Sequence, residues 1–151
     1  MLKDTFAHLF ERDLGKLIEE IKLYKDENNL WIKKGSISNS AGNLTLHIIG
    51  NLNHFIGFAL GNTGYIRERD SEFSTQFAPR EELLARLEKT IDVVVKTLCN
   101  ISREDLDKAF PIEKQGTIFS TDYMLLHLFG HLSYHLGQIN YHRRIIEGTL
   151  T

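Results

Sequence analysis

The sequence predicts an all-α fold, a four-helix bundle with a long connection between its second and third helices. Apolar residues recur at three- and four-residue steps in four segments of about five turns each. The 151 residues include only 2 prolines, so few positions interrupt a helix. Hydrophobic residues make up 42% and charged residues 25%, as in ordinary globular proteins, and we expect one domain spanning residues 1–151.

The first half of the chain contains two of the expected helices. Residues 5–26 have apolar side chains on one helix face and charged side chains on the other, which predicts an amphipathic helix with Asp4 as its N-cap. The stretch 33–42 is rich in Ser, Asn and Gly, which is typical of a loop. The second helix is expected over residues 43–60, and it is unusually apolar for a surface helix.

The second half begins with a polar connection, residues 61–79, whose Gly, Asn and Ser content argues against regular structure through its first part. The third helix should open at Pro79, with acidic residues in its first turn, and end near Asn100. A short helical turn capped by Ser102 should follow, and then a turn or small hairpin over 111–117. The last helix is expected over 120–147, since Gly148 stops it.

Composition and charge exclude several functional classes. The 18 Lys and Arg residues nearly balance 20 Asp and Glu residues and form no basic cluster, so nucleic acid is not an expected partner. The single cysteine, Cys99, excludes an intramolecular disulfide and paired-thiolate metal sites, and we expect it to be buried. The N-terminus carries charges every few residues and lacks the apolar stretch of a signal peptide or membrane span, so we expect a cytoplasmic protein.

Four of the seven histidines, His127, His131, His135 and His142, fall in the last expected helix at steps of four, four and seven. These steps place them on a stripe about 80° wide. Two imidazoles one turn apart can converge on one ion, and His47, in the apolar second helix, is the best candidate for a third ligand. Three neutral imidazoles suit Zn²⁺, Ni²⁺, Fe²⁺ or Co²⁺ and leave positions open for water or substrate, as in catalytic metal sites.

The same residues are also compatible with ordinary hydrogen-bonded core positions. His127 lies one turn outside the pair, and His142 lies near the helix C-terminus, where a histidine favours the helix dipole; the spacing leaves open whether these two or His54 contribute. Asn51 and Gln138 share the faces of the candidate ligands. Either could orient a ligand or a bound water, or make a routine interhelical contact, and no residue is assigned a catalytic role.

Two segments resemble the signature segments of the DinB-like (YfiT-like) family: LTLHIIGNLNHF around His47 and HLFGHLSYHLGQINYHRRIIEG from His127. The segment GYIRERDSEF at 64–73 also resembles a stretch in a family subgroup of unknown function. The resemblance implies a metal triad at His47, His131 and His135, with Zn²⁺ or Ni²⁺ as the metal, and a homodimer. It further implies action with low-molecular-weight thiols such as bacillithiol or mycothiol, or a metal-dependent hydrolase.

The leading hypothesis is a thiol-dependent S-transferase that acts on a small molecule. A hydrolase would need a general base, and no carboxylate stands out beside the triad. The charges at Arg67, Arg69, Asp70 and Glu72 are expected to form a structural ion-pair network, with substrate contact as the alternative. A non-catalytic dimeric bundle related to stress would show no metal dependence, and bis-histidine haem binding would show a Soret band.

Overall fold

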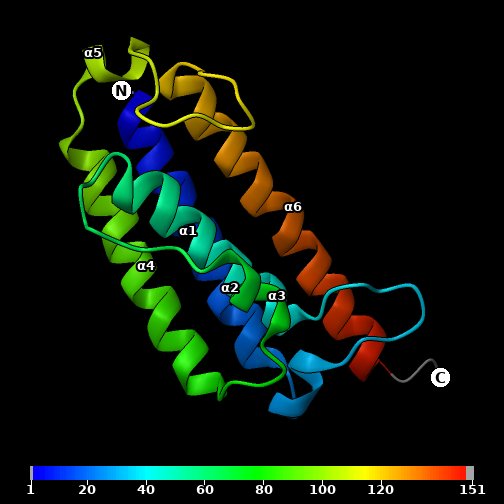
Figure 1. Cartoon of the computed structure of the whole chain (residues 1–151). Helices are drawn as coiled ribbons and strands as arrows, with labels where there is room; N and C mark the ends of the chain where they lie inside the picture. Colours follow the sequence, from blue (N-terminus) through cyan, green and yellow to red (C-terminus); the bar gives the residue numbers. More distant parts are fainter. Residues whose placement is uncertain (1, 149–151) are drawn as a thin grey trace.

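The computed structural model describes residues 2–148, and it confirms the all-α helical bundle (Figure 1). Its long helices are α1 (Leu2–Leu23), α2 (Ala41–Leu52), α4 (Arg80–Asn100) and α6 (Thr121–Glu147). Its short helices are η1 (Glu27–Trp31), η2 (Asn53–Phe58), α3 (Arg69–Ser74) and α5 (Arg103–Asp107). None of the helices within 2–148 is long and apolar enough to cross a membrane.

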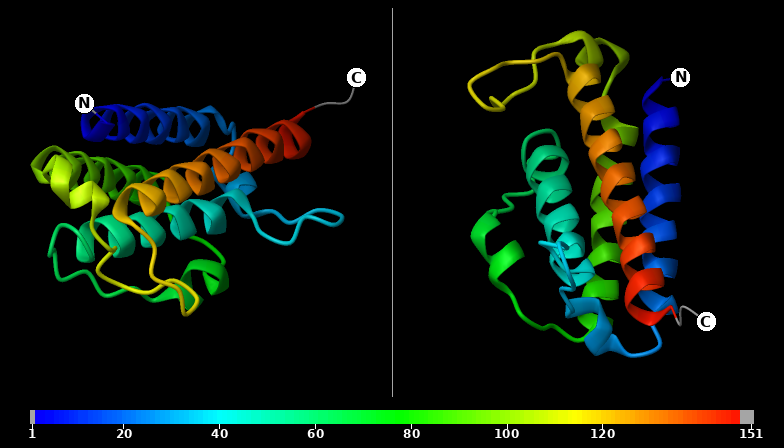
Figure 2. Two further views of the ribbon diagram at one scale, coloured as in Figure 1. Left: turned by 90° about the horizontal axis from the view of Figure 1, so that it is seen from above. Right: turned by 90° about the vertical axis from the view of Figure 1, so that its right-hand side faces the viewer.

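The long helices pack so that α1 and α2 each contact both α4 and α6. All of α2 is buried, because α3, α4, α6 and η1 surround it, and this explains why its sequence is unusually apolar. Both views of Figure 2 place α3 and the 108–120 loop on the same side of α2 and α6. One core joins the four long helices through fully buried side chains, among them Leu14, Leu52, Leu87 and Leu132.

The second helix begins earlier and changes form sooner than the sequence predicts. Ser40 is its N-cap, since the hydroxyl accepts a hydrogen bond from the Asn43 N–H at 3.1 Å. After Leu52 the helix widens into a π-helical turn, in which the Ala59 N–H donates to the His54 carbonyl at 3.1 Å. The expected α-helix over 43–60 is therefore an α-helix followed by a π turn.

Three further expectations need correction. The first helix begins at Leu2, so Asp4 lies in its first turn, where the helix dipole favours an anion, and is not the N-cap. The helix ends at Leu23, and η1 follows it, with Asp26 accepting a hydrogen bond from the Asn28 N–H at 2.9 Å. Cys99 is exposed rather than buried, because it lies on the outer face of the last turn of α4.

The remaining connections follow the predicted pattern. The polar connection is irregular until Glu68, after which α3 forms. Ser102 and Asp105 form a capping box at α5. In the 108–120 loop, Lys114 pairs with Thr117 across a tight turn, as expected of a small hairpin.

Candidate metal centre

Three imidazole rings meet between α2 and α6. His47 projects from α2, whereas His131 and His135 project from successive turns of α6. The Nε2 atom of His131 lies 3.1 Å from the Nε2 of His47 and 3.0 Å from the Nε2 of His135. The fold thus brings together two histidines one helical turn apart and a third that is 84 residues away in the chain.

The outer nitrogens of two rings are held by side-chain oxygens. His47 Nδ1–H donates to Glu72 Oε1 at 3.0 Å, and His135 Nδ1–H donates to Gln138 Oε1 at 2.7 Å. A carboxylate or amide oxygen can only accept, so both rings carry their proton on Nδ1 and present an Nε2 lone pair toward the centre.

The inner nitrogens match the requirements of a cation. A proton on Nε2 of His131 can satisfy only one of the two lone pairs that face it, whereas one cation satisfies all three nitrogens. Imidazole nitrogens bound about 2.0–2.1 Å from one tetrahedral ion lie about 3.3 Å apart. Two observed separations, 3.0 and 3.1 Å, are close to that value, and the ligand atoms of all three rings lie within 4.8 Å of one another, so these residues could hold a divalent ion such as Zn²⁺.

Two of the three rings, His131 and His135, have lowered pKa values that favour the neutral form in which an imidazole binds a metal. Burial is the main cause that lowers the pKa of His131 to about 3, and the neighbouring His135 and His47 lower it further. Burial also lowers the pKa of His135, although the hydrogen bond with Gln138 opposes this shift. Both imidazoles are therefore neutral near pH 7, as metal binding requires.

Glu72, from α3, is the site residue that the sequence reasoning missed as a neighbour of the triad. Its side chain is buried, and Arg67 forms a two-point contact with it, from Nε to Oε2 at 2.9 Å and from Nη2 to Oε1 at 2.8 Å. Burial would raise the pKa of Glu72, but hydrogen bonds with His47 and Arg67 outweigh burial and lower it. Of the expected ion-pair network, the Arg67–Glu72 pair is present and extends to His47, whereas Arg69 lies over the ring of Phe73.

Gly50 allows α3 to approach α2 this closely. A Cβ atom at this position would overlap the carboxylate of Glu72 and would lie 3.4 Å from Nε of Arg67. A glycine in the middle of an apolar helix costs stability, so the close approach is its structural reason. This glycine was the sequence signal that could have indicated a partner for the helix face next to His47.

The two expected supporting residues differ in their contacts. Gln138 contacts the triad directly through His135. Asn51 lies one turn beyond His47 and is buried, with 7% of its surface exposed. Its Oδ1 atom accepts no hydrogen bond from any described residue, so it is free to accept one from a ligand or a water molecule.

The structure places the other histidines outside the triad. The ring of His54 stacks on Phe58 in the π turn. His127 is exposed, and its Nε2 atom contacts Nζ of Lys114. His142 is buried, and burial lowers its pKa more than its hydrogen bond to a backbone carbonyl raises it, so the expected interaction of a charged ring with the helix dipole is wrong.

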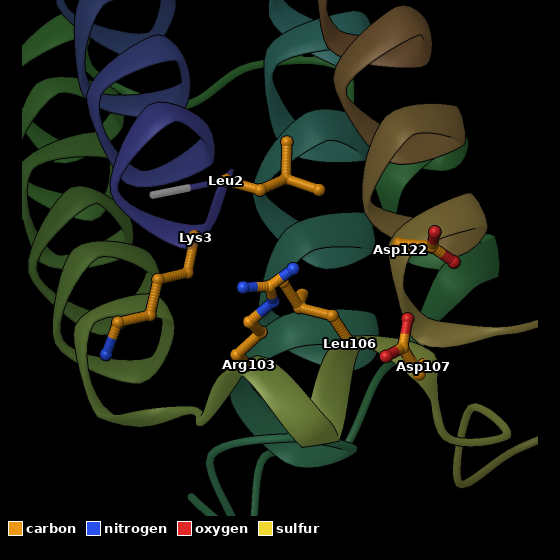
Figure 3. Close-up of a pocket in the computed structure, with 6 residues that line it drawn as sticks. All are labelled: Leu2, Lys3, Arg103, Leu106, Asp107 and Asp122. Carbon is orange, nitrogen blue, oxygen red and sulfur yellow. The ribbon is translucent and has the colours of Figure 1, made fainter.

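Two cavities lie near opposite ends of α6, and one of them borders the triad. One, of about 320 Å³, is lined by His135 and Gln138 together with residues 36–39 of the loop before α2. Figure 3 shows another, of about 390 Å³, where the start of α1 meets α5 and the start of α6; its lining residues are Leu2, Lys3, Arg103, Leu106, Asp107 and Asp122. No triad histidine lines this second cavity, so it is not part of the candidate metal centre.

Comparisons with known proteins agree with this architecture. A family model described as a protein of unknown function (DUF1572) matches residues 8–149, which include the triad and Glu72. Among solved structures, a conserved protein from Enterococcus faecalis superposes with a TM-score of 0.77 at 16% identity over 99% of both chains. At that identity the likeness concerns the fold alone. The search of curated proteins gave no match.

Proposed function

The chain belongs to the DUF1572 family, whose description assigns no activity. We therefore propose a function from the geometry of the site, namely that the protein is a metal-dependent enzyme. In this proposal His47, His131 and His135 bind one divalent ion. One observation carries it: the three Nε2 atoms converge while Glu72 and Gln138 occupy the outer nitrogens. Zn²⁺ and Ni²⁺ are the favoured ions, because both accept neutral imidazoles and the resemblance to the DinB-like family points to them.

The proposed reaction is S-transfer from a low-molecular-weight thiol such as bacillithiol to a small electrophile. His47, His131 and His135 would hold the ion, and the ion would supply the positive charge that lowers the pKa of a thiol beside it toward neutral pH. The thiol proton goes to solvent, a sulfur–carbon bond forms with the electrophile, and the leaving group departs with its electron pair. The chain's own contribution is to hold the three rings in the correct tautomer and orientation.

The position of Glu72 favours a thiol over water as the nucleophile. A hydrolase needs a base that can reach the attacking water. The Glu72 carboxylate faces Nδ1 of His47, on the outer side of the ring, and it is held there by Arg67. Its role is therefore to position His47, so a hydrolase that used Glu72 as its base is disfavoured and a thiol is the proposed nucleophile.

The first experiment is elemental analysis of protein purified without chelator. We expect one Zn or Ni ion per chain in the wild type, and its loss in His131→Ala and in His135→Ala. The matched control is His8→Ala, which removes an exposed histidine from α1 and should keep the metal. Wild-type protein that stays metal-free after reconstitution would overturn the metal site.

The second experiment tests the reaction. Metal-loaded protein is mixed with bacillithiol and a panel of electrophiles, and free thiol is followed with a chromogenic reagent, while a panel of esters and amides is tested for hydrolysis. We expect thiol loss that requires the metal and His131. Hydrolysis without any thiol loss, in protein that holds its metal, would replace the transferase by the hydrolase.

A further inference from the structure

A lysine lies beside the triad, on the loop between α5 and α6. Lys114 stands at the base of a tight turn, where its N–H donates to the Thr117 carbonyl at 2.9 Å and the Thr117 N–H donates back at 3.0 Å. The two residues at the tip, Gln115 and Gly116, have φ values of 50° and 76°. This left-handed turn fixes where the backbone of Lys114 lies relative to α6.

The side chain of Lys114 reaches the helix that carries two of the triad histidines. Its Nζ atom contacts Nε2 of His127, which lies one turn before His131 on the same stripe of α6. Burial and the other two triad rings are the main causes that lower the pKa of His131. The charges of Lys114 and His127 are the remaining causes, and they also lower it. The ammonium group therefore lies at the edge of the triad nearest the start of α6.

Lys114 has no carboxylate partner within the part of the chain that the structure describes. Its contact is with His127, and burial is the one cause that shifts its pKa, which it lowers. The negative charge of Glu72 is already matched by Arg67. A partly desolvated ammonium without a counter-ion is unfavourable, and an anion bound next to it would remove that cost.

Asn51 lies near the same end of the triad. Leu44 and His135 line one cavity, so positions before His47 in α2 lie opposite the later turns of α6, and Asn51 lies toward the earlier turns. Its buried Oδ1 lacks a donor among the described residues. A ligand that carries an anionic group and an N–H donor would complement both Lys114 and Asn51.

We propose that Lys114 and His127 form a subsite for the carboxylate of the thiol that binds at the triad, so that the cosubstrate is an anionic thiol. The proposal rests on the proposed function, because it places the thiol sulfur at the open position beside His131. The divalent ion and three neutral rings carry a net positive charge, and Lys114 adds to it, so the site selects anions. Lys114 acts on binding and selectivity and takes no part in bond making.

The test compares two thiols that differ only in a carboxylate. Full-length protein is loaded with Co²⁺ and titrated with N-acetylcysteine or with N-acetylcysteamine, and binding is followed by the sulfur-to-cobalt charge-transfer absorption. We expect the wild type to bind N-acetylcysteine about tenfold more tightly. Lys114→Met should abolish this preference without weakening N-acetylcysteamine, whereas Lys114→Arg should retain it. Lys89→Met, an exposed lysine on α4, is the control for net charge and should behave as wild type.

The outcomes separate the subsite from the metal site. Equal affinities of the wild type for the two thiols, or a preference that survives in Lys114→Met, would overturn the subsite alone. Wild-type protein that binds no Co²⁺ would overturn the metal site and the subsite with it. A loss of affinity for both thiols in Lys114→Met, with Co²⁺ still bound, would assign Lys114 a purely structural role and reject the proposal.

Discussion

Two histidines of α6, His135 and His142, lie seven residues apart and nearly on one helix face, yet their ring nitrogens are used differently. In His142 the protein satisfies both nitrogens: the Tyr24 O–H donates to Nδ1 at 2.7 Å, and Nε2–H donates to the Ile32 carbonyl at 2.7 Å. In His135 only Nδ1 has an oxygen partner, while Nε2 faces the Nε2 of His131. The comparison shows that the partner of the second nitrogen distinguishes a structural histidine from a candidate ligand.

The two environments also differ in what they connect. The hydrogen bonds of His142 join α6 to the end of α1 and to the residue after η1, so they hold the bundle together. The triad instead joins α6 to α2 through nitrogen atoms that do not form a satisfied hydrogen-bond set. Removing His142 should therefore affect stability, whereas removing His131 should affect ligand binding.

The strongest test measures metal binding and stability in variants of His131 and His142. His131→Ala should lose the bound metal and change the unfolding free energy of the metal-free protein by less than about 1 kcal/mol. His142→Ala should keep the metal and lose about 1–3 kcal/mol, because the buried Tyr24 hydroxyl loses its partner at Nδ1. Elemental analysis and urea denaturation measure the two quantities. A folded His142→Ala protein without metal would show that His142 is also needed for metal binding, contrary to this comparison.

The next largest effect should come from the outer partner of His47. Glu72→Gln keeps an acceptor for the Nδ1–H but removes the charge, so metal affinity should fall by about 10–100-fold. Competition with a chromophoric chelator measures this affinity. Glu68→Gln, an exposed residue just before α3, is the matched control and should leave it unchanged. Equal affinities of the two variants would show that Glu72 only stabilises α3.

A smaller effect is expected when Glu72 is displaced indirectly. In Gly50→Ala the new methyl group overlaps the Glu72 carboxylate, so metal affinity should fall by up to about tenfold. Gly130→Ala on α6 meets no atom within 4 Å and should raise stability by about 0.5–1 kcal/mol, as expected for alanine in a helix. A similar gain in Gly50→Ala, with unchanged affinity, would contradict the packing argument.

The smallest effect concerns acid stability. Burial lowers the pKa of His142 below its ordinary value of 6.5, so as pH falls the unfolded chain takes up this proton before the folded one. Stability should therefore decline below about pH 6.5, and wild type should lose more than His142→Gln between about pH 7.5 and about pH 5.5. Urea denaturation at both pH values gives the difference. Identical losses in the two proteins would show that His142 does not contribute.

The fold could be predicted well from the sequence because helix periodicity is a local signal. The boundaries of α4 and α6 follow from Pro79, Ser120 and Gly148, which act within one turn of each helix end. The π turn after Leu52 could not be predicted in this way. It depends on backbone hydrogen bonds five residues apart, for which apolar spacing carries no signal.

The candidate site shows the same limit. The convergence of His131 and His135 follows from their four-residue spacing, and His47 follows from the apolar character of its helix. The contact between His47 and Glu72 joins an α-helix to a connection without periodicity, 25 residues along the chain. The charged residues around Glu72 favoured an ion pair, but only the tertiary packing showed that this pair reaches the triad.

The close approach at Gly50 has an evolutionary consequence. Position 50 and position 72 share one small space, so a larger residue at the first can be accommodated only if the second becomes shorter. We expect the two positions to change together among homologous chains, for example alanine at 50 with aspartate at 72, which withdraws the carboxylate by one methylene. Such paired changes would record in sequence history that α2 and α3 meet at this point.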